Sequence, residues 1–500
     1  MQTNNTNFFK GKKVIVAGLG KSGISVIRKL SLIAGEVTAI DNNPLIDVES
    51  HFRFLEELKN FKLNLILDEK VNENTKILDD AALVILSPGV SANVGIIAGA
   101  EERNIPVWSE LEFGWQLLSK TQKKNTVAVT GTNGKTTVVS LIQKVFHGCR
   151  LESIVCGNIG NPLTDTIDAE GMSGQRDYSE KLIRIIEVSS FQLEKIKGFK
   201  PFISIILNIT SDHIDRHFSM KRYADLKFKI FLNASAGDWS ILNIDDEYIK
   251  EGLKQRNNFR GSGLNILKYS LYDNPDAQVF LRNSKILYDI NTAQGSIDIS
   301  GIRLIGPHNI SNIMSVIGAA KIYGLKDREI ENSLNRFTPL EHRIEFVAEI
   351  KGVKIYNDSK ATNPDATIKA LESFGRQVTL ILGGKDKDMD FTVLLPVLEA
   401  KVLNLILIGE TKQKILNILT AGHQNAQNCE KTAGKKTAKE KLKYKVIVCD
   451  TLQEAVDKGL EMTESGNIFL LSPACASFDM FTDYKDRGKK FKKSVLDKAK

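Results

Sequence analysis

Residues 126–140 read TVAVTGTNGKTTVVS and combine a strand, a glycine-containing loop and the start of a helix. The β-branched beginning predicts a buried strand, and the loop 131–137 turns sharply into an apolar-periodic helix that begins near Val138. Glycines let backbone N–H groups approach an anion closely, and the N-terminus of the following helix adds partial positive charge. Lys135 is expected to reach the terminal phosphates of a nucleotide, and the Thr136 hydroxyl to contact a magnesium ion. The stretch therefore predicts a nucleoside-triphosphate site.

The loop has the shorter form G-x-x-G-K-T-T, because Val129 stands where the general phosphate-loop pattern has glycine. A glycine turn that carries an exposed lysine is the simpler alternative. Strand, loop and helix follow one another in the order that phosphate binding requires, and this order favours the nucleotide site.

The length of 500 residues predicts about three domains of roughly 100–200 residues each. Residues 1–13 are polar and have no apolar segment long enough for a signal peptide, so we expect none, and no apolar run reaches the ~18 residues of a membrane span. The five cysteines form no C-x-x-C pair, which favours buried thiols in a reducing compartment over disulfides or zinc. We therefore expect a cytoplasmic protein without a membrane span.

The net charge of +8 is unevenly distributed, with two lysine-rich runs at 431–445 and 485–500. Such runs can contact nucleic acid or an anionic membrane, but they usually form solvated faces or loops. Because these lysines lack the interleaved aromatic pattern of nucleic-acid-binding segments, we expect no nucleic-acid partner.

A second glycine-rich loop lies near the N-terminus. A buried strand, 13–17, leads into GLGKSG at 18–23, and the next strand ends at Asp41. This is the G-x-G-x-x-G fingerprint of dinucleotide-binding folds, with its acidic residue about 20 positions further on. The same geometry serves any pyrophosphate, including that of a nucleotide sugar. A later strand, 82–86, ends at Ser87, whose hydroxyl either contacts a ligand or caps the next helix.

Two strands in the centre of the chain end in polar side chains. Glu187 lies near the end of the strand within 182–190, and His213 follows the strand 202–206. Magnesium prefers oxygen ligands, so Glu187 suits this metal and His213 is a weaker ligand. The alternative is that Glu187 caps a helix and His213 is a surface histidine. Because both residues follow the phosphate loop in the expected order, we favour the metal site.

Three further signals are weaker. Asn309 and Asn312 lie at i and i+3 of a predicted helix, where their amides either hold a nucleobase or ribose or cap the helix. An amphipathic helix over 223–231 carries Lys227. We interpret Cys475 as a small packing residue, because no histidine partner lies nearby in sequence.

Strand–loop–helix units recur along the whole chain, including after the proline-containing junction 338–343. We predict an α/β protein of three domains. These are a Rossmann-like N-terminal domain, 1–122, a central domain like those of P-loop ATPases, 123–337, and a Rossmann-like C-terminal domain, 338–500.

Taken together, these motifs resemble those of the Mur ligase family, and most closely its D-glutamate-adding members. The resemblance covers all three predicted domains. The motifs that carry it occur in the family's order: GTNGKTT, GNIGNP, EVSSFQLE, NITSDHIDRH, GPHNISN, EHR, NDSKATN, LGGKDKD and LLSPACASFD. DSKATN and SPACASFD separate these members from the ligases that add L-alanine, diamino acids or the D-Ala-D-Ala dipeptide.

The resemblance implies an ATP-dependent ligase that adds D-glutamate to UDP-N-acetylmuramoyl-L-alanine through an acyl phosphate, in the cytoplasmic stage of peptidoglycan synthesis. The implied cofactors are ATP, two Mg²⁺ ions and CO₂, the last held as a carbamate on Lys227. CO₂ turns a cation that two magnesium ions repel into a carboxylate that they attract. Without the resemblance, Lys227 would be interpreted as an ordinary lysine on a helix surface. The protein is expected to be a monomer.

Carried over residue by residue, the resemblance implies three binding sites and a metal centre. The implied ATP contacts are Gly131, Thr132, Asn133, Gly134, Lys135, Thr136, Thr137, Asn309, Asn312, Arg343 and Asp358. The implied UDP-sugar contacts are Gly20, Lys21, Ser22, Asp41, Asn42, Ser87 and Asn158. The implied D-glutamate contacts are Lys360, Thr362, Lys387, Ser477, Phe478 and Tyr484. The implied metal ligands are Thr136, Glu187, His213 and Lys227 as its carbamate, and the implied catalytic residues are Lys135, Glu187, His213 and Lys227.

Two features depart from the family's pattern. Tyr484 stands where the family often has phenylalanine, which adds a hydroxyl to a packing surface near the D-glutamate contacts. The lysine-rich stretch 423–445 is an insertion that we interpret as a mobile loop.

Other classes of function remain open from the sequence alone. An NAD-dependent oxidoreductase would use the loop 18–23 but not the loop 131–137. A folate polyglutamylating ligase would share the ATP machinery and take a folate instead of a UDP-sugar. A nucleic-acid-stimulated ATPase would use the lysine runs, and a structural or regulatory relative would fold without turnover.

Overall fold

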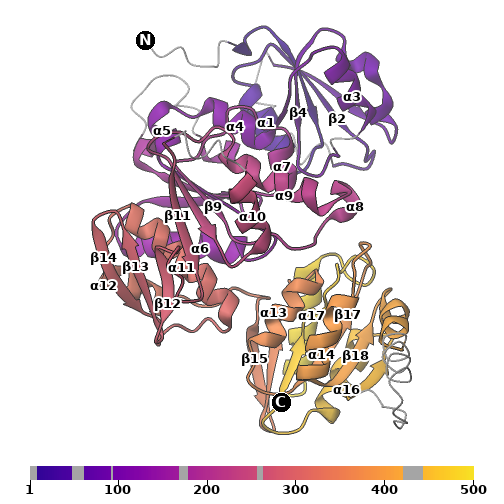
Figure 1. Ribbon diagram of the computed structural model, residues 1–500. Helices are drawn as coiled ribbons and strands as arrows, with labels where there is room; N and C mark the ends of the chain where they lie inside the picture. Colours follow the sequence, from indigo (N-terminus) through magenta and orange to yellow (C-terminus); the bar gives the residue numbers. More distant parts are fainter. Residues whose placement is uncertain are drawn as a thin grey trace. The chain divides into compact units, whose positions relative to one another are not determined.

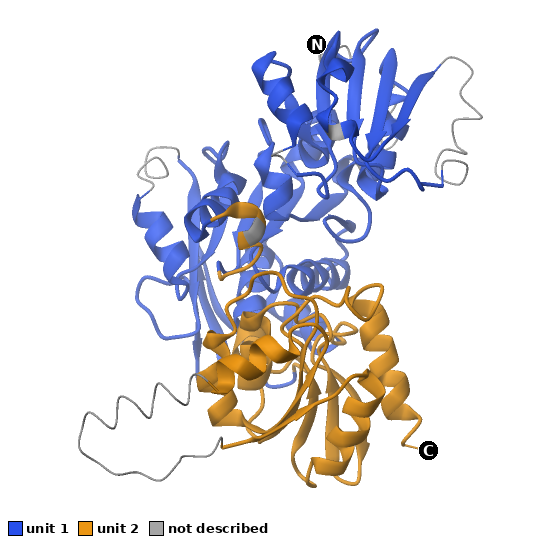
Figure 2. Ribbon diagram, turned by 90° about the vertical axis from the view of Figure 1, so that its right-hand side faces the viewer, with its two compact units in different colours: residues 1–209, 219–301, 311–336 blue, residues 210–218, 302–310, 337–500 orange. Residues whose placement is uncertain are grey.

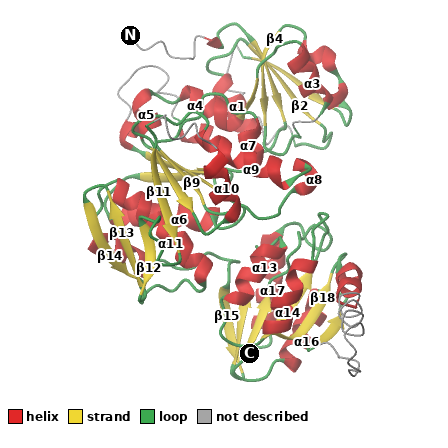
Figure 3. Cartoon of the chain, in the orientation of Figure 1, coloured by secondary structure: helices red, strands yellow, loops and turns green. Residues whose placement is uncertain are grey.

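The computed structural model describes residues 8–47, 61–91, 94–167, 178–255, 263–420 and 443–499. In these residues the chain forms three sheets, with helices between the strands (Figures 1 and 3). The α/β class with three sheets is therefore confirmed. Most of the predicted insertion, residues 423–442, lies outside the described part of the chain.

The first sheet is fully parallel and has the strand order β3-β2-β1-β4-β5. Its strands are β1 (Lys13–Ala17), β2 (Glu36–Asp41), β3 (Lys62–Leu67), β4 (Ala81–Leu86) and β5 (Val107–Ser109). Its helices are α1 (Lys21–Leu30), α3 (Gly95–Glu102) and α4 (Glu110–Leu117). The central strand β1 is apolar on both faces, as expected for a parallel strand that helices cover on both sides. The strand order reverses between β1 and β4, where open α/β sheets bind ligands.

The second sheet has nine strands in the order β14-β13-β12-β11-β10-β9-β6-β8-β7. Neighbouring strands from β7 to β12 are parallel, and β12, β13 and β14 form an antiparallel edge. The strands are β6 (Thr126–Thr130), β7 (Ser153–Gly157), β8 (Ile183–Glu187), β9 (Ile203–Ile206), β10 (Trp239–Asn243), β11 (Asn265–Ser270), β12 (Val279–Arg282), β13 (Lys285–Ile290) and β14 (Ala293–Asp298). The helices along this stretch of the chain are α5 (Lys120–Lys124), α6 (Lys135–Gly148), α7 (Ser190–Glu194), α8 (Ile214–His217), α9 (Met220–Phe228), α10 (Glu247–Gln255), α11 (Pro307–Ile322) and α12 (Asp327–Asn335).

Two predicted helix boundaries were wrong. Helix α6 begins at Lys135 rather than near Val138, because Gly134 adopts a left-handed conformation that turns the chain directly into the helix. The predicted helix 223–231 is shifted toward the N-terminus: α9 starts after the N-cap Ser219, and its last residues, 229–231, tighten into a 3₁₀ turn.

The third sheet has the order β15-β16-β20-β17-β18-β19, with only β15 antiparallel to its neighbour. Its strands are β15 (Glu345–Ile350), β16 (Val353–Asn357), β17 (Val378–Gly383), β18 (Val402–Ile408), β19 (Lys445–Val448) and β20 (Ile468–Leu471). Its helices are α13 (Pro364–Glu372), α14 (Leu395–Lys401), α16 (Leu452–Met462) and α17 (Tyr484–Leu496). The carboxyl ends of β16, β17 and β20 therefore meet at one edge.

The chain divides into two compact units (Figure 2). The first comprises residues 1–209, 219–301 and 311–336 and contains the first two sheets; the second comprises 210–218, 302–310 and 337–500 and contains the third. The predicted domain boundaries after residues 122 and 337 stay a prediction. Within the described residues, no helix combines the length and the apolar character needed to cross a membrane.

Candidate active site

The predicted contacts of the nucleotide sugar gather in the first unit. Six of the seven line one cavity of about 580 Å³, near the carboxyl ends of β1, β2 and β4. They are Gly20, Lys21, Ser22, Asp41, Asn42 and Ser87. The cavity lies where the strand order reverses, as expected for a ligand site in an open α/β sheet.

Polar side chains shape the glycine-rich loop of this cavity. Asp41 accepts hydrogen bonds from the backbone N–H of Leu19 at 2.7 Å and of Asn43 at 2.9 Å. Ser87 donates to the Gly18 carbonyl at 2.6 Å. The alternative that Ser87 caps the next helix is wrong, because α3 has Val94 at its N-cap. Asp41 and Ser87 thus fix the loop while they also line the cavity.

The loop 131–137 follows β6 and ends in helix α6, as predicted. Gly131 and Gly134 have φ values of +153° and +86°, which other residues rarely adopt. Lys135 folds back over the loop and donates to the carbonyls of Gly131 at 2.7 Å and Thr132 at 2.8 Å. Its ammonium group is therefore held directly at the loop, and the alternative of an exposed lysine on a glycine turn is wrong.

Asn208 supports the phosphate loop, and sequence reasoning missed it. Its side chain accepts from the Asn133 N–H at 2.8 Å and donates to the Asn133 carbonyl at 3.1 Å. Its carbonyl accepts from the Thr132 N–H at 2.9 Å. In the sequence, its position just after a predicted strand was the signal that could have identified it; the structure shows that this strand, β9, lies beside β6.

The two predicted asparagines of helix α11 have different surroundings. Asn312 lies against the phosphate loop, since a Cβ on Gly134 would come within 2.6 Å of its Oδ1. Asn309 donates to the Ile305 carbonyl at 2.7 Å, which fastens the turn before the helix. Asn309 belongs to the second unit and Asn312 to the first, so their joint role in binding a nucleotide stays a prediction.

Glu187 ends strand β8 beside the phosphate-loop strand, where it pairs in register with Val129 of β6. Its Oε1 accepts from the Asn158 amide at 3.0 Å. Its Oε2 is buried and has no hydrogen-bond partner among the described residues. A buried carboxylate oxygen without a partner fits a magnesium ligand. The capping alternative is wrong, because Ser189 is the N-cap of the next helix.

Lys227 is buried, with 1% of its surface exposed, so it is not an ordinary surface lysine. Its ammonium group donates to the Gly131 carbonyl at 2.9 Å and lies 4.5 Å from the centre of the Tyr223 ring. The Tyr223 hydroxyl is 3.2 Å from Thr132 Oγ1. Helix α9 therefore brings Lys227 directly to the phosphate loop.

His213 belongs to the second unit, whereas Glu187 belongs to the first. It is half-buried, precedes α8 with a φ of +55°, and its Nε2 is 3.7 Å from Asp212 Oδ2. Asp212 Oδ2 also accepts from the Asn363 amide at 3.3 Å. The predicted grouping of His213 and Glu187 in one metal centre therefore stays a prediction.

Asp358 is buried at the carboxyl end of β16, where it accepts from Ser472 Oγ at 2.9 Å and from the Ile344 N–H at 3.2 Å. Burial raises the pKa of Asp358 to about 7, although these hydrogen bonds and the nearby charges of Arg343 and Arg487 oppose the shift. Arg343 itself is half-buried.

The predicted D-glutamate residues lie on the loops after β16, β17 and β20 and at the first position of α17, all in the second unit. Lys360 Nζ is 4.9 Å from the centre of the Tyr484 ring. The loop after β17 meets the loop after β20, where the Lys385 N–H donates to the Ala476 carbonyl at 2.9 Å. Of the remaining residues, Ser477 is buried, Phe478 is 69% exposed, and Thr362 and Lys387 are half-buried. Their arrangement around one ligand stays a prediction.

Cys475 lies on the loop after β20 and is buried. Burial raises the pKa of its thiol to about 12. A thiol that stays protonated at neutral pH is a poor nucleophile, which supports the interpretation of Cys475 as a packing residue.

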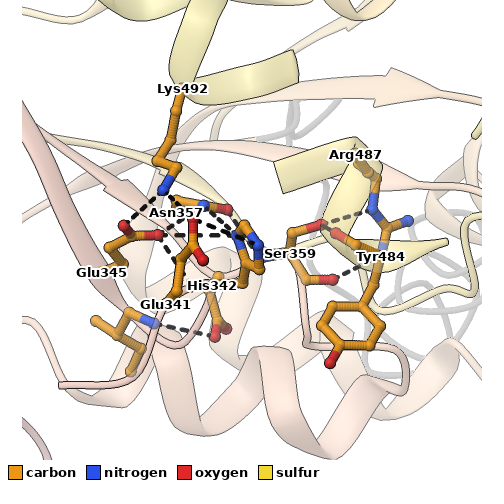
Figure 4. A network of polar contacts seen from close by, with 10 residues as sticks. Glu341, His342, Glu345, Asn357, Ser359, Tyr484, Arg487 and Lys492 are labelled. Atoms are coloured by element: carbon orange, nitrogen blue, oxygen red, sulfur yellow. Dashed lines mark hydrogen bonds and ion pairs between the residues drawn. The ribbon is translucent and has the colours of Figure 1, made fainter. Parts of the chain in front are cut away.

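A polar network behind these loops was missed by sequence reasoning (Figure 4). Lys492 of α17 donates to Glu341 at 2.5 Å and to Glu345 at 2.9 Å. Asn357 contacts His342 Nδ1 at 2.9 Å and donates to Glu345 at 3.0 Å. The two glutamates and the histidine have the chemistry of metal ligands, but the ammonium group of Lys492 already supplies the cation.

Comparisons with known proteins cover the whole chain. Sequence models match the Mur ligase MurD-like N-terminal domain over residues 12–109, the Mur ligase middle domain over 129–320, and the Mur ligase glutamate ligase domain over 342–475. The chain is 39% identical to a UDP-N-acetylmuramoylalanine–D-glutamate ligase of Caldanaerobacter subterraneus, and the match covers 98% of this chain and 99% of the relative. It is 38% identical to the ligase of that name from Thermoanaerobacter pseudethanolicus, with the same coverage.

The fold also matches solved structures. The crystal structure of the UDP-N-acetylmuramate–alanine ligase MurC from Thermotoga maritima aligns with a TM-score of 0.53 at 17% identity, over 98% of this chain and 100% of that one. Since the sequence matches to relatives extend over nearly the full length at well above 30% identity, the chain belongs to the Mur ligase family.

Proposed function

We propose that this chain is an ATP-dependent ligase that joins D-glutamate to UDP-N-acetylmuramoyl-L-alanine in the cytoplasmic stage of peptidoglycan synthesis. The observation that carries the proposal is the phosphate loop 131–137 with the unpartnered Oε2 of Glu187 beside it. It occurs in a chain that matches relatives named for this reaction along their full length. The protein acts as a monomer and needs neither nucleic acid nor a membrane.

ATP binds at the loop 131–137, whose N–H groups and helix N-terminus face the phosphates. Lys135 exchanges its two carbonyl contacts for phosphate oxygens and neutralises charge as the phosphoryl group is transferred. Asn312 borders the loop at Gly134. Asn309, Arg343 and Asp358 complete the nucleotide contacts.

The metal ligands are Thr136, Glu187, His213 and Lys227 as its carbamate. These residues would hold two magnesium ions, whose chemistry would be to neutralise charge on the phosphates. Carbamylation of Lys227 would leave one N–H on its nitrogen, which could still donate to the Gly131 carbonyl, and would add a carboxylate able to ligate a metal ion. Oε2 of Glu187, which has no hydrogen-bond partner among the described residues, could ligate such an ion without losing a protein hydrogen bond.

The sugar nucleotide occupies the cavity of the first sheet, and Asn158 contacts the muramoyl part. D-Glutamate binds among Lys360, Thr362, Lys387, Ser477, Phe478 and Tyr484. The ammonium groups of Lys360 and Lys387 match the two carboxylates of this amino acid.

The reaction has two steps. An oxygen of the L-alanine carboxylate attacks the γ-phosphorus of ATP, which breaks the bond to the β-phosphate oxygen and releases ADP. The D-glutamate amine then attacks the acyl carbon, loses a proton, and expels phosphate to leave an amide. A carboxylate is a poor electrophile, so phosphorylation provides the leaving group that amide formation requires.

The test is phosphate release from ATP and magnesium in the presence of UDP-N-acetylmuramoyl-L-alanine, with D-glutamate, L-glutamate or no amino acid. Phosphate should appear only with D-glutamate, together with a product heavier by one glutamate residue. Lys135→Ala should lower kcat by about a thousandfold, because it removes a charge aimed at the transferring phosphate. Lys144→Ala on the exposed part of the same helix should leave kcat unchanged. Turnover that ignores the stereochemistry of glutamate, or requires a folate, would refute the proposal.

A further inference from the structure

Helix α17 (Tyr484–Leu496) joins two loops that are far apart in sequence. Its Arg487 is 1% exposed and donates four hydrogen bonds. Two go to Ser359, to Oγ at 3.0 Å and to the carbonyl at 2.8 Å. The other two go to the carbonyls of Cys475 at 3.0 Å and Ala476 at 3.2 Å. Figure 4 shows the contacts of Arg487 with Ser359. One guanidinium group therefore holds the loop after β16 and the loop after β20 at a fixed separation.

The geometry of the guanidinium group is specific to this task. Its planar fork presents donors in several directions at once, which a lysine ammonium on a flexible stem does not reproduce. Three of the four acceptors are backbone carbonyls, so the contacts fix the course of the main chain rather than one rotamer. The loops so fixed carry Asp358 and Lys360 on one side and Ser477 and Phe478 on the other.

Stability alone is a weak explanation for this residue. Burial lowers the pKa of Arg487 to about 10, so the group keeps its charge at neutral pH and bears a desolvation cost. The hydrogen bonds described for its guanidinium group all go to neutral acceptors, and replacing a buried charge by an apolar side chain often leaves stability unchanged or improved. A buried charge in such a place is better explained by what it positions.

The residue after Arg487, Gly488, also packs closely on its surroundings. A Cβ on Gly488 would come within 2.3 Å of His342 Nδ1, so the helix backbone packs directly on the histidine. The carbonyl of that histidine accepts from the Lys360 N–H at 3.1 Å, and Asn357 accepts from the Ser359 N–H at 3.1 Å. The helix therefore contacts the loop after β16 both through Arg487 and through the turn that holds His342.

We propose that Arg487 is a positioning residue, which sets the distance between the two loops that bind D-glutamate in the proposed function. It touches no substrate. It acts by holding the main chain of residues 357–360 against that of residues 475–476, so that Lys360 on one loop and Ser477 and Phe478 on the other can bind one ligand. The inference rests on the proposed function for the identity of that ligand, and on the four hydrogen bonds for the mechanism.

The experiment compares Arg487→Lys with a matched control, Arg376→Lys, in the full chain. Arg376 lies in the same unit and donates to the Gly466 carbonyl at 2.6 Å, at the opposite end of strand β20. For Arg487→Lys we expect KM for D-glutamate to rise about tenfold or more, with KM for the UDP-sugar changed less than about twofold, because misplaced contacts act on the ligand they hold. Hydrogen exchange should become faster in residues 357–363 and 472–478, while Arg376→Lys leaves both the kinetics and this exchange unchanged.

Each outcome decides the question. Unchanged KM for D-glutamate and unchanged exchange in both loops, or an equal rise of KM for every substrate, would overturn the positioning role. If Arg487→Lys does not fold, Ser359→Ala removes one acceptor and should show the same split with a smaller rise in KM. If the wild-type protein does not use D-glutamate, the proposed function fails, and faster exchange in the two loops of Arg487→Lys still supports the positioning role.

Discussion

The phosphate loop of the first unit and the paired loops of the second lie at the carboxyl ends of parallel strands, but they are held in different ways. The loop 131–137 owes its shape to its own glycines, and two side chains from outside it, Asn208 and Lys227, hydrogen-bond to its backbone. The loops after β16 and β20 owe their arrangement to helix α17, whose Arg487 lies 128 residues beyond Ser359.

The difference indicates how each site can fail. A loop shaped mainly by its own backbone is most sensitive to a change within it, because glycine conformations there cannot be replaced by contacts from outside. Loops held by a remote helix are sensitive to substitutions that touch no ligand, because the hydrogen bonds that position these loops lie behind the site. Substitutions within the loop 131–137 should therefore impair the first site most. Substitutions in helix α17, away from any ligand, should impair the second.

The largest effect should follow from Gly134→Ala. The φ of +86° strains any residue with a Cβ, and the added methyl group would lie 2.6 Å from Asn312 Oδ1. Strain and overpacking together should weaken ATP binding about a hundredfold, which calorimetric titration with ATP would measure.

Gly324→Ala is the matched control for this substitution. Gly324 has a φ of +70° in the same unit, but no atom lies within 4 Å of its added Cβ. It should cost about 1 kcal/mol of stability and leave ATP affinity unchanged. Equal losses of ATP affinity in both variants would show that strain anywhere in the unit, rather than the shape of the loop, governs the site.

The next effect concerns Asp358, the buried carboxyl group of the second unit. Its pKa rises from 3.8 to about 7 on folding, so its contribution to stability is complete below pH 3.8 and is lost as the pH rises toward 7. Asp358→Asn keeps the shape of the protonated form and removes this loss. Calorimetry would measure the difference in free energy of unfolding between variant and wild type. This difference should shift in favour of the variant by about 2 kcal/mol from pH 4 to pH 8, and the pKa change sets an upper bound of roughly 4 kcal/mol on the shift.

Glu110 provides the corresponding test in the first unit. It is buried, accepts from the N–H and hydroxyl of Thr164 at 2.9 Å, and has its pKa raised to about 7 by burial. Wild type should lose stability as the pH rises from 4.5 to 7, because Glu110 then ionises in a buried place. Glu110→Gln should reduce this loss in the unfolding transition of the first unit. If either substitution shifts both transitions equally, the two carboxyl groups do not report on separate units.

The contrast also explains what the sequence could predict. Glycine spacing, strand ends and helix starts are local, so the loop 131–137, Glu187 and the residues around the first-sheet cavity could be located from their neighbours in the chain. Asn208 also carried a signal in the sequence, since this polar residue follows the apolar run of a predicted strand; the structure then places that strand, β9, beside β6.

The remaining parts depend on contacts that no spacing encodes. Lys227 has the helical surroundings of a surface lysine and is nevertheless buried, because α9 packs against the phosphate loop. Lys492 and Glu345 lie 147 residues apart, and Arg487 sits in a lysine-rich helix whose sequence suggests only solvent exposure. Their roles follow from how the third sheet brings the end of the chain back to the turn at 341–345.

The smallest effect should follow from Lys492→Met, which breaks the ion pairs of α17 with Glu341 and Glu345. The side chains are 22%, 53% and 21% exposed, so water and salt screen part of the attraction, and the loss of stability should stay below about 1 kcal/mol. Because the helix still holds Ser359 through Arg487, KM for D-glutamate should rise only about twofold to threefold, with the difference from wild type shrinking in high salt.

Lys490→Met is the control, since it breaks an exposed i,i+4 pair with Asp486 on the same helix and leaves the contacts of Lys492 with Glu341 and Glu345 intact; its ammonium group lies 5.3 Å from the centre of the Phe481 ring rather than against the turn at 341–345. It should leave KM for D-glutamate unchanged. If Lys492→Met instead raises this KM as much as Arg487→Lys does, the ion pairs and not the guanidinium contacts set the position of the helix. The remote support of the second site would then be electrostatic, and salt alone should loosen it while the phosphate loop of the first unit stays unaffected.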